Sequence, residues 1–140
     1  MKITISGSSK FAKEMVEYKK LLEDLGHEVS VHDHYIAMAN GNAPDLMRQL
    51  QEEHANLKIE HDYIRDYYNR VVKSDAILVL NFDKNGIANY VGGNTLMEIG
   101  FAHVHNKKIF LLNDIPDMQY KEEIEAMQPT ILKNDLTQIS

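Results

Sequence analysis

The sequence predicts an α/β fold: a single doubly wound parallel sheet of about five strands, flavodoxin-like or Rossmann-like, with helices on both faces. Apolar runs of strand length alternate about five times with stretches whose apolar residues recur every three or four positions. The runs at residues 76–81 and 108–112 are almost continuously apolar, as is typical of strands buried on both faces. No repeat, low-complexity tract or linker interrupts residues 1–140, so we expect one domain.

The first part of the chain predicts a strand, a helix and a second strand. Residues 3–6 form a short strand, and the apolar spacing of residues 9–25 predicts the helix that follows it. Gly26 is suited to end that helix. Valines alternate with polar residues at 28–33, which predicts an edge strand. The polar stretch 34–43 is then expected to be a loop. Residues 36–43 of this loop could act as a lid over a bound base, although their composition is also that of an ordinary mobile connection.

The rest of the chain continues the alternation. Residues 44–73 have a helical pattern that is long for one globular helix, so we expect a break near residues 56–60. Asn85-Gly86 marks a turn after the strand at 76–81. The remaining elements that we expect are a helix at 93–105, a strand at 108–112, a short helix at 118–127 and a final strand at 130–132.

Composition narrows the classes of protein. The chain has 15 basic and 21 acidic residues, a net charge of −6, which argues against broad binding of nucleic acid or of an anionic membrane. It contains no cysteine, so disulfides and thiolate metal sites are excluded. The apolar runs are too short to span a bilayer and no signal core follows the first residues, so we expect a soluble cytoplasmic protein.

Ligands of doubly wound sheets bind beyond the carboxyl ends of the strands. Residues 6–10, 81–94 and 113–116 fall at that edge of the predicted sheet. The first of these segments offers backbone N–H groups, two hydroxyls and an ammonium to a phosphate, although a serine that caps a helix produces the same pattern. Neither the dinucleotide nor the P-loop fingerprint is present. The candidate binding residues are Ser6, Gly7, Ser8, Ser9, Lys10, Asn81, Gly92, Gly93 and Asn94.

Two carboxylates are candidates for chemistry. Gly92 and Gly93 open a predicted helix directly after a strand, and Glu98 lies in its second turn among apolar neighbours. Such a carboxylate either has a chemical role or packs at the helix edge near the positive helix terminus. Asp75 lies at a helix–strand junction, where a capping role and a functional role are equally open.

The remaining polar and aromatic features have competing interpretations. His32 and His34 could converge on a metal, but no third ligand is evident, so we expect no metal site. The tyrosines at 63, 67 and 68 suit a core or a helix face, and one of them could instead stack on a base.

Residues 74–80, 93–102 and 107–112 together resemble the nucleoside 2-deoxyribosyltransferase superfamily, which includes the 2′-deoxynucleoside 5′-phosphate N-hydrolases. The motifs are an aspartate at the start of the third strand, Asp75, and a Glu-x-Gly-x-Ala helix that begins at Glu98. The resemblance implies that Glu98 is the nucleophile that attacks the sugar C1′ and that Asp75 assists departure of the base. It also implies that no metal or organic cofactor is needed.

One departure from the family pattern bears on the substrate. Where the transferases carry an acidic residue six positions before the nucleophile, this chain has Gly92, and the backbone around it suits a phosphate. We therefore expect cleavage of the N-glycosidic bond of a nucleoside 5′-monophosphate, releasing free base and sugar phosphate. The alternatives are a nucleoside 2-deoxyribosyltransferase that exchanges bases between nucleosides and a nucleotide-sensing module without turnover.

The resemblance also bears on partners. Members of this superfamily commonly form dimers or larger assemblies, so we expect a homodimer or a higher homo-oligomer. Apolar residues of the helical stretch 57–72 would suit a symmetric interface; they are Leu57, Ile59, Ile64, Tyr67 and Tyr68. The ligand is expected to be a small nucleoside or nucleotide, with no nucleic acid or membrane partner.

Overall fold

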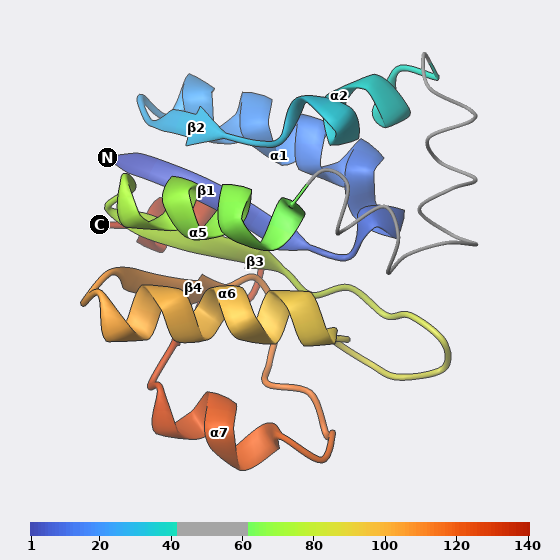
Figure 1. The fold of residues 1–140 in the computed structure, drawn as a ribbon, viewed down its shortest axis with the longest axis vertical. Helices are drawn as coiled ribbons and strands as arrows, with labels where there is room; N and C mark the ends of the chain where they lie inside the picture. The colour runs from blue at the N-terminus through green and yellow to red at the C-terminus, as the bar shows by residue number, and fades with distance from the viewer. Residues whose placement is uncertain (42–61) are drawn as a thin grey trace.

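The computed structural model describes residues 1–41 and 62–140, which form an α/β fold around one five-stranded sheet (Figure 1). All strand pairings are parallel, and the strand order is β2-β1-β3-β4-β5. The predicted fold class is therefore confirmed. The strands are β1 (Lys2–Gly7), β2 (Glu28–Ser30), β3 (Ala76–Leu80), β4 (Lys108–Leu111) and β5 (Thr130–Ile131).

The strand order changes direction at β1. This strand pairs with β2 on one side and with β3 on the other, so the connections that leave β1 and β3 diverge. Ligands of such sheets bind where the connections diverge, beyond the carboxyl ends of the strands. In the register of this sheet Gly7 pairs with Leu80, so the two strands end side by side.

Helices cover both faces of the sheet. The helices α5 (Tyr63–Val72) and α6 (Gly93–Val104) pack against each other on one face (Figure 1). The helix α1 (Ala12–Asp24), which follows the 3-10 turn η1 (Ser9–Phe11), packs on the other face. Short helical segments follow β4 and β5: α7 (Lys121–Ala126) and the 3-10 turn η2 (Leu136–Gln138). None of the described helices is long and apolar enough to cross a membrane.

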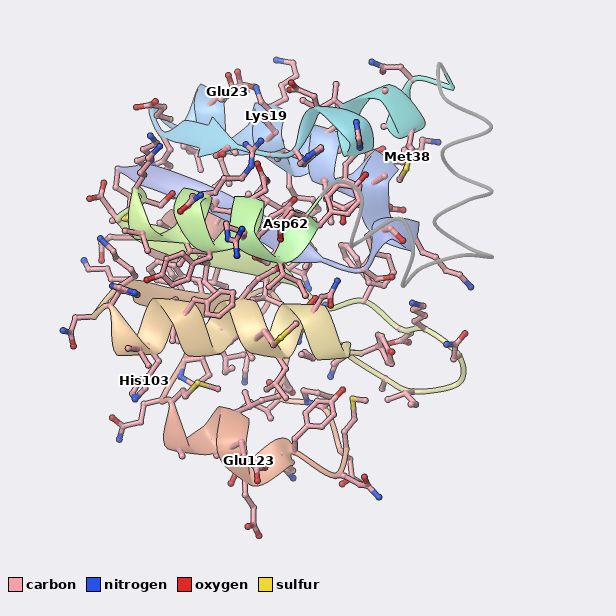
Figure 2. The ribbon with its side chains drawn as sticks, viewed as in Figure 1. Lys19, Glu23, Met38, Asp62, His103 and Glu123 are labelled. Carbon is pink, nitrogen blue, oxygen red and sulfur yellow. The ribbon has the colours of Figure 1, made fainter. Side chains whose placement is uncertain are left out.

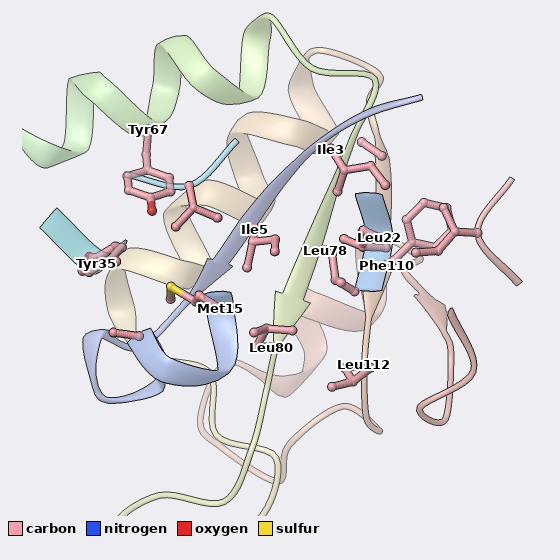
Figure 3. Packing of buried hydrophobic residues seen from close by; sticks show 14 of the residues in the cluster. Ile3, Ile5, Met15, Leu22, Tyr35, Tyr67, Leu78, Leu80, Phe110 and Leu112 are labelled. Atoms are coloured by element: carbon pink, nitrogen blue, oxygen red, sulfur yellow. The ribbon is translucent and has the colours of Figure 1, made fainter. Parts of the chain in front are cut away.

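Side chains of β3 alternate between two apolar clusters. Leu78 and Leu80 pack with Met15 of α1 in one cluster (Figure 3), whereas Ile77 and Val79 pack with Ile99 of α6 in the other. Successive residues of a strand point to opposite faces, so a five-residue apolar run fills both layers. The continuous burial of β3 agrees with its predicted central position.

Charged side chains lie on the outer surface of these layers. Lys19 and Glu23, one turn apart on α1, form an ion pair, and His103 and Glu123 point away from the sheet (Figure 2). Exposed pairs of this kind contribute about 0.5 kcal/mol to an isolated helix. The free energy of folding therefore comes chiefly from the two apolar clusters.

The predicted loop at residues 34–43 was wrong over most of its length. The helix α2 (Asp33–Ala39) occupies it, and the imidazole of His32 caps the helix by accepting a hydrogen bond from the His34 N–H at 3.0 Å. Tyr35 and Met38, three residues apart, are buried in the cluster that includes α1. The strand before it ends at Ser30 rather than at residue 33. Met38 is thus buried and Ile36 packs against the same cluster, so this part of the expected lid is a helix held on the core. Residues 40–41 are exposed, and residues 42–43 lie outside the described residues.

The predicted interface helix is described only in its second half. Asp62 caps α5 through its carboxylate, which accepts a hydrogen bond from the Arg65 N–H (Figure 2). Ile64 and Tyr68 are exposed, as expected, but Tyr67 is buried in the core, and its place in a surface patch was wrong. Leu46, Leu50, Leu57 and Ile59, with the predicted break near 56–60, lie outside the described residues. The homo-oligomer stays a prediction.

Candidate active site

A pocket opens at the carboxyl ends of β1 and β3. Its wall combines three sources: the loop after β1, the loop that leads into α6 with one face of that helix, and aromatic residues of α2 and α5. The described residues that line it are Gly7, Ser8, Ser9, Tyr35, Tyr63, Ile64, Tyr67, Lys84, Tyr90, Gly92, Gly93, Asn94, Thr95, Met97, Glu98 and Phe101. This is the position that the strand order favours for a ligand.

The helix α6 presents one face to this pocket. Asn94, Met97, Glu98 and Phe101 follow the spacing i, i+3, i+4, i+7 and all line it, whereas Ile99 faces the core. Glu98 is only 7% exposed although it carries a carboxylate. A buried carboxylate needs compensating polar groups, so its neighbours are informative.

Two phenols lie close enough to Glu98 to interact with it electrostatically. Burial raises the pKa of the Tyr35 phenol, and the Glu98 carboxylate raises it further. Burial also raises the pKa of Tyr67 well above its ordinary value, with added contributions from Tyr35 and Glu98. Both phenols therefore stay protonated at neutral pH and can donate hydrogen bonds. Figure 3 shows the Tyr67 ring extending from α5 toward the end of β1 where Tyr35 lies.

The hydroxyl of Tyr67 is a buried polar atom in the pocket wall. It lies near the backbone of His32 but has no hydrogen bond of ordinary geometry within the described residues. Buried polar atoms of this kind are usually satisfied by a partner.

A second group of rings forms the wall on the side of α2. The Tyr63 hydroxyl is hydrogen-bonded to Nδ1 of His34. The rings of Tyr63 and Tyr35 are nearly parallel, at 12°, with centroids 6.3 Å apart, and His32 meets Tyr63 edge-on at 4.8 Å. Burial, with a smaller contribution from Asp66, raises the pKa of Tyr63 to about 12. Its hydroxyl is therefore also protonated at neutral pH.

The Lys84 side chain connects the loop after β1 with the loop between β3 and α6. Its Nζ donates a hydrogen bond to Oγ of Ser8 at 2.8 Å and lies 4.9 Å from the centre of the Tyr90 ring. The Ser8 hydroxyl also caps η1 by accepting a hydrogen bond from the Lys10 N–H. Next to Tyr90, a side chain at Gly92 would be crowded, since a Cβ there would lie 3.2 Å from the ring and the ring would have to move by a few tenths of an ångström.

The structure brings together seven of the eleven residues singled out in the sequence. Glu98 shares the pocket with two groups, Gly7, Ser8 and Ser9 after β1 and Gly92, Gly93 and Asn94 at the start of α6. Their roles toward a ligand stay predictions. The glycines fit the expectation of close approach by the backbone, because α6 begins without a side-chain cap.

Three other predicted binding residues do not line the pocket. Lys10 is exposed, and Ser6 is fully buried with a hydroxyl that has no partner within the described residues. Asn81 is buried, and its side chain bridges two strand ends. Its amide donates to the carbonyls of Asn113 and Asp114 at 3.0 Å each and accepts from the Asn113 N–H at 2.9 Å. In this structure Asn81 holds loops together rather than facing a ligand.

Asp75 lies at the opposite end of the sheet. It is exposed and immediately precedes β3, where its carboxylate accepts a hydrogen bond from the Lys2 N–H at 2.7 Å. The pocket begins beyond Leu80, five residues further along the strand, which corresponds to about 16 Å. The described residues do not bring Asp75 and Glu98 together at this pocket, because the length of β3 lies between them, and the role of Asp75 stays a prediction.

Several pocket residues were not assigned from the sequence. Lys84 and Tyr90 lie in the loop after β3, where no periodicity indicates the direction of a side chain. Tyr35 lay in the predicted loop, and only its packing in α2 brings it to the pocket. The Asn85-Gly86 turn was the one local signal, since both residues adopt positive φ and close the turn that begins at Lys84.

Comparisons with known proteins find similarity among solved structures. No protein-family model matches the chain, and a search of curated proteins finds no match. Among solved structures, the chain is similar to the Clostridium botulinum CMP N-glycosidase BcmB, with 17% identity and a TM-score of 0.48. The match covers 94% of this chain and 85% of that one. The similarity is one of overall chain course.

Proposed function

We propose that this protein is an N-glycosidase that cleaves a nucleoside 5′-monophosphate into free base and sugar phosphate. The observation that carries the proposal is the buried carboxylate of Glu98 in the wall of the pocket at the strand ends. A carboxylate is suited to the oxocarbenium-like transition state of glycoside cleavage. The motif that surrounds Glu98 also resembles that of the nucleoside 2-deoxyribosyltransferase superfamily.

Glu98 acts as the nucleophile in this proposal. One carboxylate oxygen attacks C1′ of the sugar, the bond from C1′ to the base nitrogen breaks, and a glycosyl ester forms. Water then attacks C1′ and regenerates the carboxylate, with release of the sugar phosphate. The protonated phenols of Tyr35 and Tyr67 support this role, because both lie close enough to interact electrostatically with the carboxylate and can donate hydrogen bonds in the pocket.

The departing base needs a proton, and Asp75 lies too far away to supply it. We assign this step to Tyr63, which lines the pocket and whose hydroxyl is hydrogen-bonded to His34. The Tyr63 O–H donates its proton to the base nitrogen as the bond to C1′ breaks. The proton that the water loses when it attacks C1′ then returns to the hydrogen-bonded pair of Tyr63 and His34. The pKa of about 12 keeps the phenol protonated until the negative charge on the base develops.

The glycine-rich side of the pocket suits the phosphate. The first N–H groups of α6 follow Gly92 without a side-chain cap, and Ser8 contributes a hydroxyl from the loop after β1. Backbone N–H groups at a helix start favour anions. No acidic side chain occupies position 92, where the transferases carry one, and this supports a phosphorylated substrate over a free nucleoside.

The test is release of base from a panel of ribonucleosides, deoxyribonucleosides and their 5′-monophosphates, measured by chromatography. Glu98→Gln, which keeps the shape of the side chain, runs beside the parent. Glu125→Gln on the exposed surface of α7 is the matched control. We expect release from a monophosphate by the parent and by the control, but not by Glu98→Gln.

Other outcomes contradict the proposal in distinct ways. Release that requires a nucleoside and a second base together would indicate a transferase. Binding of nucleotide without release of base, equally by the parent and Glu98→Gln, would indicate a sensing module. One further measurement would support the proposal instead: a mass increase of one sugar phosphate on the acid-quenched parent, absent from Glu98→Gln, would identify the glycosyl ester directly.

A further inference from the structure

The backbone of Lys84 is held in a tight turn. Its N–H donates to the carbonyl of Ile87 at 3.0 Å, and the Ile87 N–H donates back at 2.9 Å. Asn85 and Gly86 between them adopt positive φ values of 54° and 74°, which is typical of a two-residue hairpin turn. Lys84 therefore starts from a fixed position, and its side chain lines the pocket.

The Lys84 side chain spans the two loops that a phosphate would touch. Its Nζ is bonded to Ser8 Oγ from the loop after β1 and lies over the ring of Tyr90, from the loop before α6. The Tyr90 ring packs in turn against Gly92. The ammonium thus lies beside the serine hydroxyl, and Lys84 lines the same pocket as the glycine pair that begins α6. An ammonium, a hydroxyl and backbone N–H groups are the donor set of a phosphate site.

The balance of charge makes this cation important. The chain has a net charge of −6, and Glu98 lines the pocket. Within the described lining, Lys84 is the one lysine or arginine. Lys10, the ammonium expected from the sequence, is exposed and does not line the pocket. Among the described lining residues, Lys84 therefore carries the positive charge that a phosphate dianion would meet in this pocket.

We infer that Lys84 determines specificity for the phosphate: its ammonium, together with the Ser8 hydroxyl, binds the 5′-phosphate and makes monophosphates better substrates than nucleosides. This inference rests on the proposed N-glycosidase function. It assigns the discrimination between substrates to one side chain in the loop after β3, separate from the nucleophile on α6. The Tyr90 ring keeps the ammonium over the site, since a cation is attracted to the face of an aromatic ring.

The experiment compares a nucleoside 5′-monophosphate with its own nucleoside in each variant. Lys84→Met keeps the length and the apolar stem over Tyr90 but removes the charge, and Lys84→Arg keeps the charge. Lys121→Met, at the exposed start of α7, is the matched control. The quantity of interest is the ratio of kcat/KM for the monophosphate to kcat/KM for the nucleoside.

We expect Lys84→Met to lower kcat/KM for the monophosphate by about 50-fold, mainly through KM, as befits a lost charged hydrogen bond. The value for the nucleoside should change by less than about 3-fold, since a hydroxymethyl group makes no charged contact. Lys84→Arg should restore most of the preference, and Lys121→Met should retain it fully. An equal loss with both substrates, or a loss with neither, overturns the inference.

A binding measurement separates this inference from the proposed function. Ribose 5-phosphate and ribose are titrated into the parent and Lys84→Met by calorimetry, which requires no turnover. Tighter binding of the phosphorylated sugar that Lys84→Met abolishes supports the inference even if no base is released. Equal binding of both sugars by the parent overturns the inference even if Glu98 proves to be the nucleophile. Should Lys84→Met not fold, Lys84→Gln takes its place, and the parent titrations still decide.

Discussion

The two ends of the sheet hold carboxylates in opposite circumstances. Glu98 is buried in a pocket beyond the carboxyl ends of the strands, near phenols that can donate to it. Asp75 is exposed at the amino ends, where it accepts a backbone hydrogen bond from Lys2. Both residues belong to segments that resemble one family motif, yet β3 separates them. The surroundings of each carboxylate therefore depend on the end of the sheet at which it lies.

The two ends also differ in how completely their polar groups are paired. At the amino end the backbone continues the sheet: the Asp75 N–H donates to Lys2, and the Lys108 N–H donates to Asp75. At the carboxyl end the buried hydroxyls of Ser6 and Tyr67 have no partner in the part of the chain that the structure describes. Buried polar atoms without partners are uncommon. The backbone groups named at the amino end are therefore paired, whereas two buried hydroxyls at the carboxyl end have no partner among the described residues.

The sharpest test of this contrast is Glu98→Gln. Loss of the nucleophile should reduce the rate of base release on the order of 10⁴-fold, because the glycosyl ester can no longer form. Circular dichroism and urea unfolding check that the variant folds as the parent does. A folded variant that keeps more than a tenth of the parent's activity would remove Glu98 from the chemistry.

The next effect concerns the proton donor. Tyr63→Phe keeps the ring but loses the hydroxyl that is bonded to His34, so kcat should fall by about 100-fold with KM little changed. Tyr68→Phe, on the exposed side of the same helix, is the matched control and should leave both parameters unchanged. The pH profile of kcat is measured for all three proteins. If Tyr63→Phe matches the parent at every pH, the proton comes from another group.

A third variant tests whether Asn81, at the carboxyl end of the sheet, contributes to stability or to ligand binding. Asn81→Ala removes three hydrogen bonds to Asn113 and Asp114, so it should lower the free energy of unfolding by about 2 kcal/mol. Activity per folded molecule should change by less than about 3-fold, because the side chain does not line the pocket. Urea unfolding and base release measured on the same samples separate the two effects. A large rise in KM with unchanged stability would return Asn81 to the binding site.

The smallest effect is expected at the other end of the sheet. Asp75→Asn keeps an oxygen that accepts from the Lys2 N–H, so both the free energy of unfolding and kcat/KM should stay close to the parent's values. The stability change should be less than about 1 kcal/mol. Should the folded variant lose activity, the contrast between the two ends fails, and the role that the family resemblance implies for Asp75 regains its support.

The fold class could be predicted from the sequence because the apolar patterns that indicate its strands and helices are local. The apolar run of β3 and the spacing of apolar residues in α1 report burial directly, and both elements lie close to their predicted bounds. The helix α2 escaped notice because its residues are mostly polar or small, and it is stabilised by Tyr35 and Met38 packing in the core. That packing depends on tertiary contacts that no short window of sequence contains.

The site was predictable in part for a related reason. The glycine pair and Glu98 form a continuous motif at one helix start, so their joint position follows from the sequence. Asp75 precedes β3, so it lies at the amino end of that strand, away from the carboxyl ends where ligands of such sheets bind. Its candidate role came from the family resemblance and not from its place in the sheet. Lys84 had no assigned role because the direction of its side chain is set by the Asn85-Gly86 turn and by contacts with Ser8 and Tyr90.

The tight fit of Gly92 against Tyr90 constrains how this protein can evolve. An acidic side chain at position 92, which the resembling transferases carry, would begin with a Cβ 3.2 Å from the Tyr90 ring. The ring would have to shift, and the seat of the Lys84 ammonium would shift with it. A replacement of Gly92 is therefore expected to act on the pocket through Tyr90 and Lys84 as well as through the new side chain itself.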